Sequence, residues 1–183
     1  MKVRHQMFVL SALAMLCLRT PAVARNAVQI KVGDTPPELL GKDVDGREVR
    51  LSDYRGKVVV MSFWATWCPP CRKELPILER LQEVGSDRGL QVIAVNWEEE
   101  GATFRRAVKI LSSFQLKFVS DTSGKVGKSY GVNAIPTMLL IDKDGKVAFM
   151  TIGYGESVIN SLVPAVNKAL GLDDGSSASA GAP

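Results

Sequence analysis

The chain has very little histidine and cysteine. Its 183 residues contain one histidine, His5, and three cysteines, Cys17, Cys68 and Cys71. His5 and Cys17 both fall in the first 24 residues, which we interpret below as a removable signal. Without them the chain can form no Cys–His or Ser–His catalytic pair and no His-ligated metal site. One cysteine pair in so long a chain also differs from the dense cysteine pattern of a disulfide-stapled miniprotein.

The start of the chain has the pattern of a secretory signal peptide. Lys2 and Arg4 give it a positive end, Met7 to Leu18 is an apolar run, and Ala22-Val23-Ala24 offers a small-residue cleavage site. The run of about twelve residues is shorter than the roughly 20 that a transmembrane helix needs. We therefore predict a signal at residues 1–24, cleaved at this site, and export to the periplasm. An uncleaved membrane anchor is the alternative.

The chain also lacks a strong excess of one charge. The 23 Lys and Arg residues exceed the 19 Asp and Glu residues by four. Lys2, Arg4 and Arg19 belong to the predicted signal, so its removal leaves 20 basic against 19 acidic residues, a net charge of +1. Nucleic-acid-binding proteins carry a pronounced basic patch, so we expect no nucleic-acid partner.

The remainder of the chain is predicted to hold one domain. A hydrophobic content of 46% is enough for a single core. We place a polar lead-in at residues 25–37, the folded domain at 38–170 and a disordered tail, rich in Gly, Ser and Ala, at 171–183. We expect a monomer.

Hydrophobic patterns predict an α/β sandwich with a mixed central sheet. Nearly continuous apolar runs are typical of strands buried on both faces. The predicted strands are Lys57–Trp64, Leu90–Trp97, Met138–Ile141 and, after an Asp144-Gly145 turn, Val147–Ile152. A small hairpin is predicted at Asp43–Leu51 around an Asp45-Gly46 turn.

Helical spacing of apolar residues predicts the remaining elements. The first helix follows the cysteine pair and presents Leu75, Leu78, Leu81 and Val84 on one face. An extra amphipathic helix is predicted within Glu98–Ser113, a short helix capped by Asp121 or Thr122 and ending near Gly131, and a final helix at Ser157–Leu170. Pro164 should kink this final helix or delay its start.

The chemistry is predicted to reside in Cys68 and Cys71, which stand two residues apart between a buried strand and a helix. Pro69 favours the first position of that helix, so Cys68 lies at the helix N-terminus, where backbone N–H groups and the dipole favour a thiolate. Cys71 lies one turn further in. We predict that Cys68 attacks a client disulfide and that Cys71 resolves the mixed disulfide. Their own disulfide would be the redox group, with no other cofactor.

Other uses of a cysteine pair fit this sequence less well. A static disulfide over so short a loop adds little stability, and a structural zinc site needs two more Cys or His ligands than the predicted mature chain has. We therefore predict no resident metal. Two alternatives stay open: a Cu(I) carrier that uses both thiolates, and a peroxiredoxin-like peroxidase, for which Thr66 lies too close to Cys68.

Several stretches resemble the TlpA, ResA and CcmG group of thioredoxin-like proteins, over roughly residues 28–170. They are Phe63–Cys71, Arg72–Pro76, the insert near residues 98–113 and Gly131–Thr137. The resemblance implies a thioredoxin-like fold with a cis Ile135–Pro136 bond that faces the cysteines and a loop that pairs with an extended client. It also implies that a membrane thiol relay supplies the electrons. The clients it implies are proteins such as apocytochrome c or copper-site assembly proteins.

The chain departs from ordinary thioredoxins in its buried charges. Thioredoxins carry an Asp and a Lys on neighbouring strands, where this chain has Ser62 and Ala94. Glu74, three residues after Cys71, stands where ResA-like proteins carry an acid. A partly buried carboxylate there would have a raised pKa and could exchange protons with Cys71. We predict that the nearby run Glu98–Glu100 is a solvated charge cluster.

Apolar residues are predicted to surround the attacking sulfur. Trp67, Pro69 and Pro70 should form an exposed rim that contacts clients, whereas Trp64 should belong to the core. The two prolines carry no charge, so nothing between the cysteines strongly stabilises a thiolate. This favours a reductant over a strong oxidant.

Overall fold

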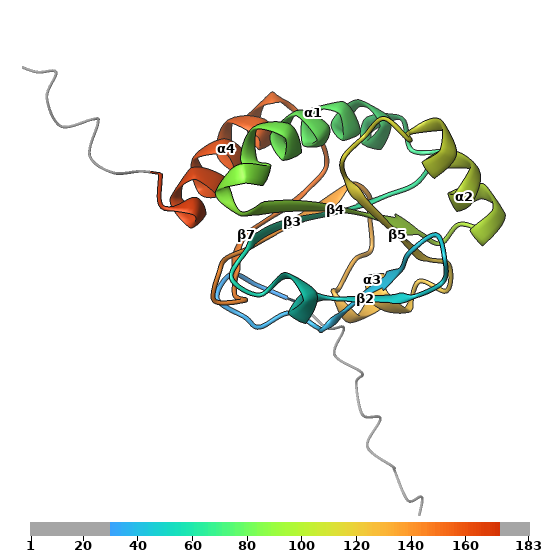
Figure 1. The fold of residues 1–183 in the computed structure, drawn as a ribbon, viewed down its shortest axis with the longest axis horizontal. Helices are drawn as coiled ribbons and strands as arrows, with labels where there is room; N and C mark the ends of the chain where they lie inside the picture. Colours follow the sequence, from blue (N-terminus) through green and yellow to red (C-terminus); the bar gives the residue numbers. More distant parts are fainter. Residues whose placement is uncertain (1–29, 173–183) are drawn as a thin grey trace, which may run out of the picture.

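Residues 30–172 are described in a computed structural model of the chain (Figure 1). The predicted signal at residues 1–24 lies outside these residues. The same holds for residues 25–29 of the predicted lead-in and for residues 173–183 of the predicted tail.

A seven-stranded mixed sheet forms the centre of the domain, in the order β2-β1-β5-β4-β3-β6-β7. The strands are β1 (Leu39–Lys42), β2 (Glu48–Arg50), β3 (Val58–Trp64), β4 (Leu90–Trp97), β5 (Lys117–Asp121), β6 (Thr137–Ile141) and β7 (Val147–Ile152). Strands β3, β4 and β5 run parallel, and all other neighbours pair antiparallel. The predicted mixed sheet is confirmed. The N-terminal hairpin is also present, but its first strand, β1, ends just before the predicted Asp43–Leu51 range.

Strand β5 lies inside the sheet, and the sequence patterns did not predict it. Only Phe118 and Val119 form an apolar pair in it, between Lys117 and the polar Ser120 and Asp121. So short an apolar run resembles a loop when it is taken by itself. Its position between β1 and β4 makes it a strand, because both neighbours supply hydrogen-bonding edges.

Four α-helices within residues 30–172 surround the sheet. They are α1 (Pro69–Gly85), α2 (Gly101–Ile110), α3 (Lys125–Ser129) and α4 (Glu156–Leu170), and two short 3₁₀ turns lie at Leu51–Tyr54 and Ser86–Arg88. Helix α2 is the predicted insert. Helix α4 begins one residue before the predicted start and continues through Pro164, so of the two effects predicted for this proline, a kink or a delayed start, the delayed start is wrong.

Two further details of the helices differ from the prediction. Val84 is 52% exposed. A helix has 3.6 residues per turn, so each step of three residues falls about 60° short of a full turn, and Val84 no longer lies on the face that begins at Leu75. The N-cap of α3 is Gly124 rather than Asp121 or Thr122. Asp121 still serves this helix, since its carboxylate accepts the Gly127 N–H at 2.8 Å.

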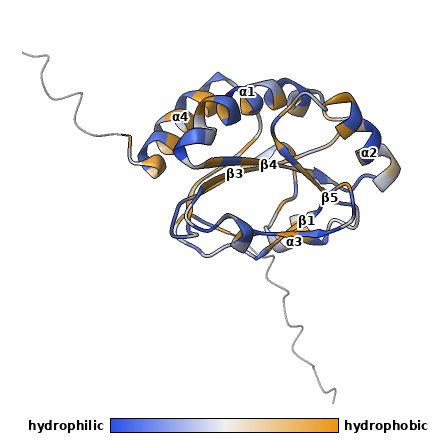
Figure 2. Ribbon diagram, in the orientation of Figure 1, coloured by the Kyte–Doolittle hydropathy of each residue, from blue (hydrophilic) through white to orange (hydrophobic). Residues whose placement is uncertain are grey.

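The helices divide the core into two layers. Helices α1, α2 and α4 cover one face of the sheet, and α3 lies on the other face (Figure 1). Successive residues of β3 point to opposite faces, so Val58 and Val60 pack under α1 whereas Val59 and Met61 pack toward α3. All of β3 is buried, and in Figure 2 it is coloured hydrophobic while α1 alternates between hydrophilic and hydrophobic.

The architecture brings the cysteine motif to one end of the sheet. Strand β3 is central and ends at Trp64, and α1 begins at Pro69, so the motif occupies the short connection between them. Within the described range, no helix combines the length and the apolar character that crossing a membrane requires.

Candidate redox site

Cys68 and Cys71 are joined by a disulfide at the first turn of α1. Their sulfur atoms are 2.03 Å apart and their Cα atoms 5.3 Å. Cys68 is the N-cap residue of the helix, Pro69 follows as its first residue, and the Cys71 N–H donates to the Cys68 Sγ at 3.2 Å. The helix N-terminus therefore directs a backbone donor at the first sulfur, as the sequence predicted.

The loop before β6 faces this sulfur. The Ile135–Pro136 peptide bond is cis, as the resemblance implied. The Cys68 Sγ lies 3.9 Å from the Ile135 carbonyl oxygen. The Pro136 carbonyl oxygen accepts the Gly153 N–H at 2.7 Å, which ties the loop to the end of β7. The loop and the attacking sulfur are thus held on one surface.

The residues around the disulfide differ in exposure as predicted. Trp67 is 61% exposed, and Pro69 and Pro70 are also exposed, so these three form an apolar rim. Cys68 itself is only 3% exposed and Cys71 is fully buried. Trp64 belongs to the core and packs edge-on against Phe118, with ring centroids 6.1 Å apart.

Glu74 is a fully buried carboxyl on the inner face of α1. Ser62 on β3 donates a hydrogen bond of 2.6 Å to its Oε2, while its Oε1 has no hydrogen-bond partner within residues 30–172. Burial raises the pKa of Glu74 from 4.5 to about 7, and the Ser62 hydrogen bond opposes this only in part. In the sequence, the signal for this hydrogen-bond partner of Glu74 was the polar Ser62 within the apolar run of β3.

Cys71 and Glu74 lie close together. They are three residues apart on α1, a spacing that places side chains on one helix face with Cβ atoms about 5–6 Å apart. Ser62 pairs with Ala94 in the β3–β4 register, and both are buried. The Asp–Lys pair of thioredoxins is therefore replaced by a neutral pair, and Glu74 supplies the buried carboxyl beside the second cysteine.

Glu99 corrects the expectation of a solvated Glu98–Glu100 run. It is only 8% exposed. Its carboxylate accepts the Thr66 N–H at 2.8 Å, the Thr66 hydroxyl, and the Asn96 side-chain N–H at 2.6 Å. Glu99 therefore anchors the connection that precedes Cys68. The sequence prediction missed this because Thr66 and Glu99 are far apart in the chain and meet only when β3 and β4 end side by side.

Replacing Glu99 by alanine is expected to loosen this connection. The change leaves the Thr66 and Asn96 donors without their charged acceptor, at a cost of about 2 kcal/mol in the free energy of unfolding. The Thr66 amide should also exchange its hydrogen faster in native-state exchange measured by NMR. Glu100→Ala is the control, because the Glu100 side chain is exposed and makes no capping hydrogen bond. Equal stability and equal Thr66 exchange in both variants would contradict the anchoring role.

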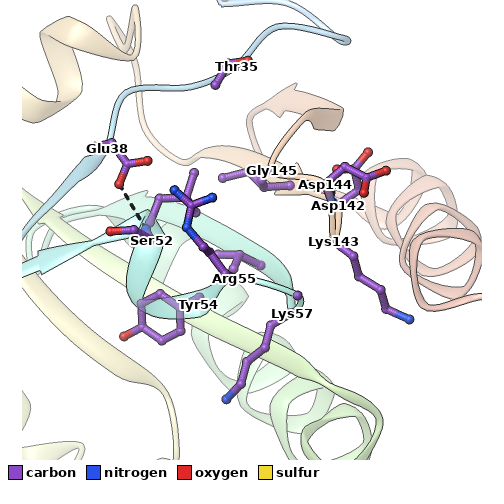
Figure 3. A pocket seen from close by; sticks show the side chains of 14 residues that line it. Thr35, Glu38, Ser52, Tyr54, Arg55, Lys57, Asp142, Lys143, Asp144 and Gly145 are labelled. Atoms are coloured by element: carbon purple, nitrogen blue, oxygen red, sulfur yellow. Dashed lines mark hydrogen bonds between the residues drawn. The ribbon is translucent and has the colours of Figure 1, made fainter.

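A pocket of about 210 Å³ lies at the opposite end of the sheet (Figure 3). Its lining includes Arg55, Lys57 and Lys143, and Figure 3 shows Glu38 accepting a hydrogen bond from Ser52 there. The strand β3 separates it from the disulfide by roughly 20 Å, at about 3.3 Å per residue. It therefore belongs to a different surface. Within the described residues, no three His, Cys, Asp or Glu side chains are grouped to hold a metal ion.

Comparison with known proteins gives the same picture as the geometry. The Redoxin family profile matches residues 31–170. The thiol-disulfide oxidoreductase ResA of Geobacillus thermodenitrificans is 40% identical over 126 residues, which cover 68% of this chain and 71% of that protein. The ResA of Bacillus subtilis is 34% identical over 142 residues, which cover 76% of this chain and 78% of that protein.

A solved structure shows a similar fold. The crystal structure of a thiol:disulfide interchange protein DsbE from Chlorobium tepidum aligns with a TM-score of 0.67 and 33% identity, over 77% of this chain and 99% of that one. The likeness confirms the thioredoxin-like sandwich that the sequence resemblance implied.

Proposed function

Because the chain belongs to the Redoxin family, within its TlpA-, ResA- and CcmG-like group, and is a thiol–disulfide oxidoreductase, we propose that it works as a reductant of disulfides in client proteins. The observation that carries the direction is the absence of charge between the two cysteines. The two residues between the cysteines are prolines without charge or donor. The reduced thiolate is therefore only modestly stabilised, which favours giving electrons away.

The proposed reaction uses the two sulfurs in turn. The Cys68 thiolate attacks one sulfur of the client disulfide, and the other client sulfur leaves as a thiolate. Cys71, once deprotonated, then attacks the Cys68 sulfur of the mixed disulfide, and the second client sulfur leaves. Two electrons pass to the client, and the protein ends with the Cys68–Cys71 disulfide seen in the structure.

Glu74 is proposed to manage the proton of the buried Cys71. A thiol in an apolar interior needs a base before it can attack, and Glu74 lies on the same helix face with a pKa of about 7. At neutral pH such a carboxyl is partly ionised and can accept the proton. We assign Glu74 as the proton acceptor of the second step.

The rim and the loop before β6 are proposed to hold the client. Trp67, Pro69 and Pro70 are exposed beside the sulfur, and the Ile135–Pro136 segment faces it. An extended client strand would lie across this surface and place its disulfide over Cys68. No cofactor other than the disulfide is required for this exchange.

The clients are proposed to be exported proteins with cysteine pairs, since the first residues of the chain have the pattern of a secretory signal. Apocytochrome c before haem attachment and copper-site assembly proteins are the client classes that the family resemblance implies. A membrane thiol relay would return electrons to the Cys68–Cys71 disulfide after each cycle.

The reduction potential tests the direction of electron flow. We expect a value near that of thioredoxin, about −270 mV, when the protein is equilibrated with glutathione or dithiothreitol and its thiols are counted. Pro70→His, which places a cationic donor between the cysteines, should make the potential more oxidising by on the order of 30–60 mV. A wild-type value near about −120 mV, typical of a strong oxidant, would contradict the proposal.

A further inference from the structure

A groove runs between α1 and α2 directly beside the cysteine motif. Its volume is about 380 Å³. The apolar part of its lining consists of Trp64, Leu75, Pro76, Ala107, Ile110, Leu111 and Phe114. Thr66 and Arg72 line it where it meets the motif, two residues before Cys68 and one after Cys71. The groove is therefore continuous with the surface on which disulfide exchange occurs.

One feature shows that the groove is not simply a gap in the core. Ile110, the last residue of α2, is 76% exposed, whereas Phe104 and Ala107 of the same helix are buried. An exposed aliphatic side chain costs free energy that a bound apolar group would recover.

The groove lies on the flank of Cys68 away from the loop before β6. In the sheet, β6 is on one side of β3, whereas β4 and β5, over which α2 packs, are on the other. A client strand that pairs with the Ile135–Pro136 segment is therefore contacted by the protein on only one side of the client disulfide. The α1–α2 groove is the concave apolar surface available to the other side.

We propose that the α1–α2 groove binds a bulky apolar side chain of the client polypeptide, a few residues from the cysteine under attack. The proposal rests on the disulfide-reductase function above and adds a sequence preference to it. Arg72 is exposed at the motif end of the groove and forms no ion pair within the described part of the chain. An acidic residue next to the apolar one is therefore favoured.

The test compares short peptides with an internal disulfide. One peptide carries Leu and Glu beside its first cysteine, a second carries Ser and Glu, and a third carries Leu and Gln. Reduction by the dithiol form is followed together with reduction of a small disulfide, hydroxyethyl disulfide, which cannot reach the groove. We expect the Leu–Glu peptide to exceed the Ser–Glu peptide by about tenfold in kcat/KM.

Ile110→Glu should reduce this preference to within about twofold and leave hydroxyethyl disulfide turnover and the melting temperature unchanged. Ala107→Leu, which adds bulk to the lining of the groove, should also reduce the preference to within about twofold. The control is Val84→Glu, an exposed aliphatic position on α1 outside the groove, which should keep the full preference. Arg72→Gln should equalise the Leu–Glu and Leu–Gln peptides.

Three results separate the two proposals. A wild-type protein that reduces all three peptides equally well would overturn the proposal that the groove binds a client side chain. Retention of the full Leu preference in both Ile110→Glu and Ala107→Leu would overturn it as well. A wild-type dithiol that fails to reduce even hydroxyethyl disulfide would instead overturn the reductase function on which the groove proposal rests.

Discussion

Cys71→Ser is expected to hold clients covalently on Cys68 and to reduce multiple turnover to the background rate. The first attack needs only the Cys68 thiolate at the helix N-terminus, so the mixed disulfide still forms. Release needs the second sulfur, which stands within bonding distance in the oxidised structure. Cells that express the variant, after acid quenching and alkylation, should give higher-mass bands on non-reducing gels, and mass spectrometry should identify the attached proteins.

Cys68→Ser is the matched control for this experiment. Cys71 is fully buried and cannot reach a client, so this variant should form no adducts and should also be inactive. The order of reactivity can be checked in the wild type, because the Cys68 thiol of the reduced protein should react with iodoacetamide first. Equal trapping by both variants, or trapping by neither, would contradict the assigned order.

Glu74→Gln is expected to change the pH dependence of stability. Since the folded-state pKa of Glu74 is about 7 against 4.5 for an ordinary glutamate, the native protein holds this proton more tightly than the unfolded chain. Its contribution to stability is therefore fully present below pH 4.5 and is lost as the pH rises through 7. At about 1.4 kcal/mol per pH unit, the loss reaches about 3 kcal/mol above pH 8.

The glutamine variant should escape this loss, because it stays neutral and can still accept the Ser62 hydrogen bond. Denaturant unfolding of the oxidised protein should give nearly equal free energies for both forms at pH 4.5 and an advantage of about 3 kcal/mol for Glu74→Gln above pH 8. The control is Glu83→Gln, on the exposed side of the same helix. A pH-independent difference between wild type and Glu74→Gln would show that folding does not raise the pKa of this carboxyl.

The same variant separates stability from catalysis. If Glu74 accepts the Cys71 proton, Glu74→Gln should slow release of the client below pH 8 while leaving the first attack by Cys68 unchanged. A purely structural carboxyl would alter neither step once the protein is folded. Ser62 on β3 and Ala94 on β4 are both neutral, so these two positions supply no other acid or base that could take the Cys71 proton.

Sequence patterns predicted most elements of the fold because each strong pattern is local. A continuous apolar run such as β3 is typical of a strand buried on both faces. A proline directly after Cys68 favours the start of a helix, and this preference does not depend on the rest of the fold. Strand β5 was missed because its five residues show no clear period. Its conformation follows from the strands on either side of it, and these come from distant parts of the chain.

The spacing of Cys68, Cys71 and Glu74 along α1 could be read from the chain before any fold was known, because neighbours within a single helix depend only on that spacing. Which polar groups lose contact with water depended on how distant segments pack. The tertiary structure buried Glu99 beneath Thr66, gave Glu74 its Ser62 partner and opened the groove between α1 and α2. The physical reason is that burial and hydrogen bonding between distant segments depend on how helices and strands pack, and no local pattern records that packing.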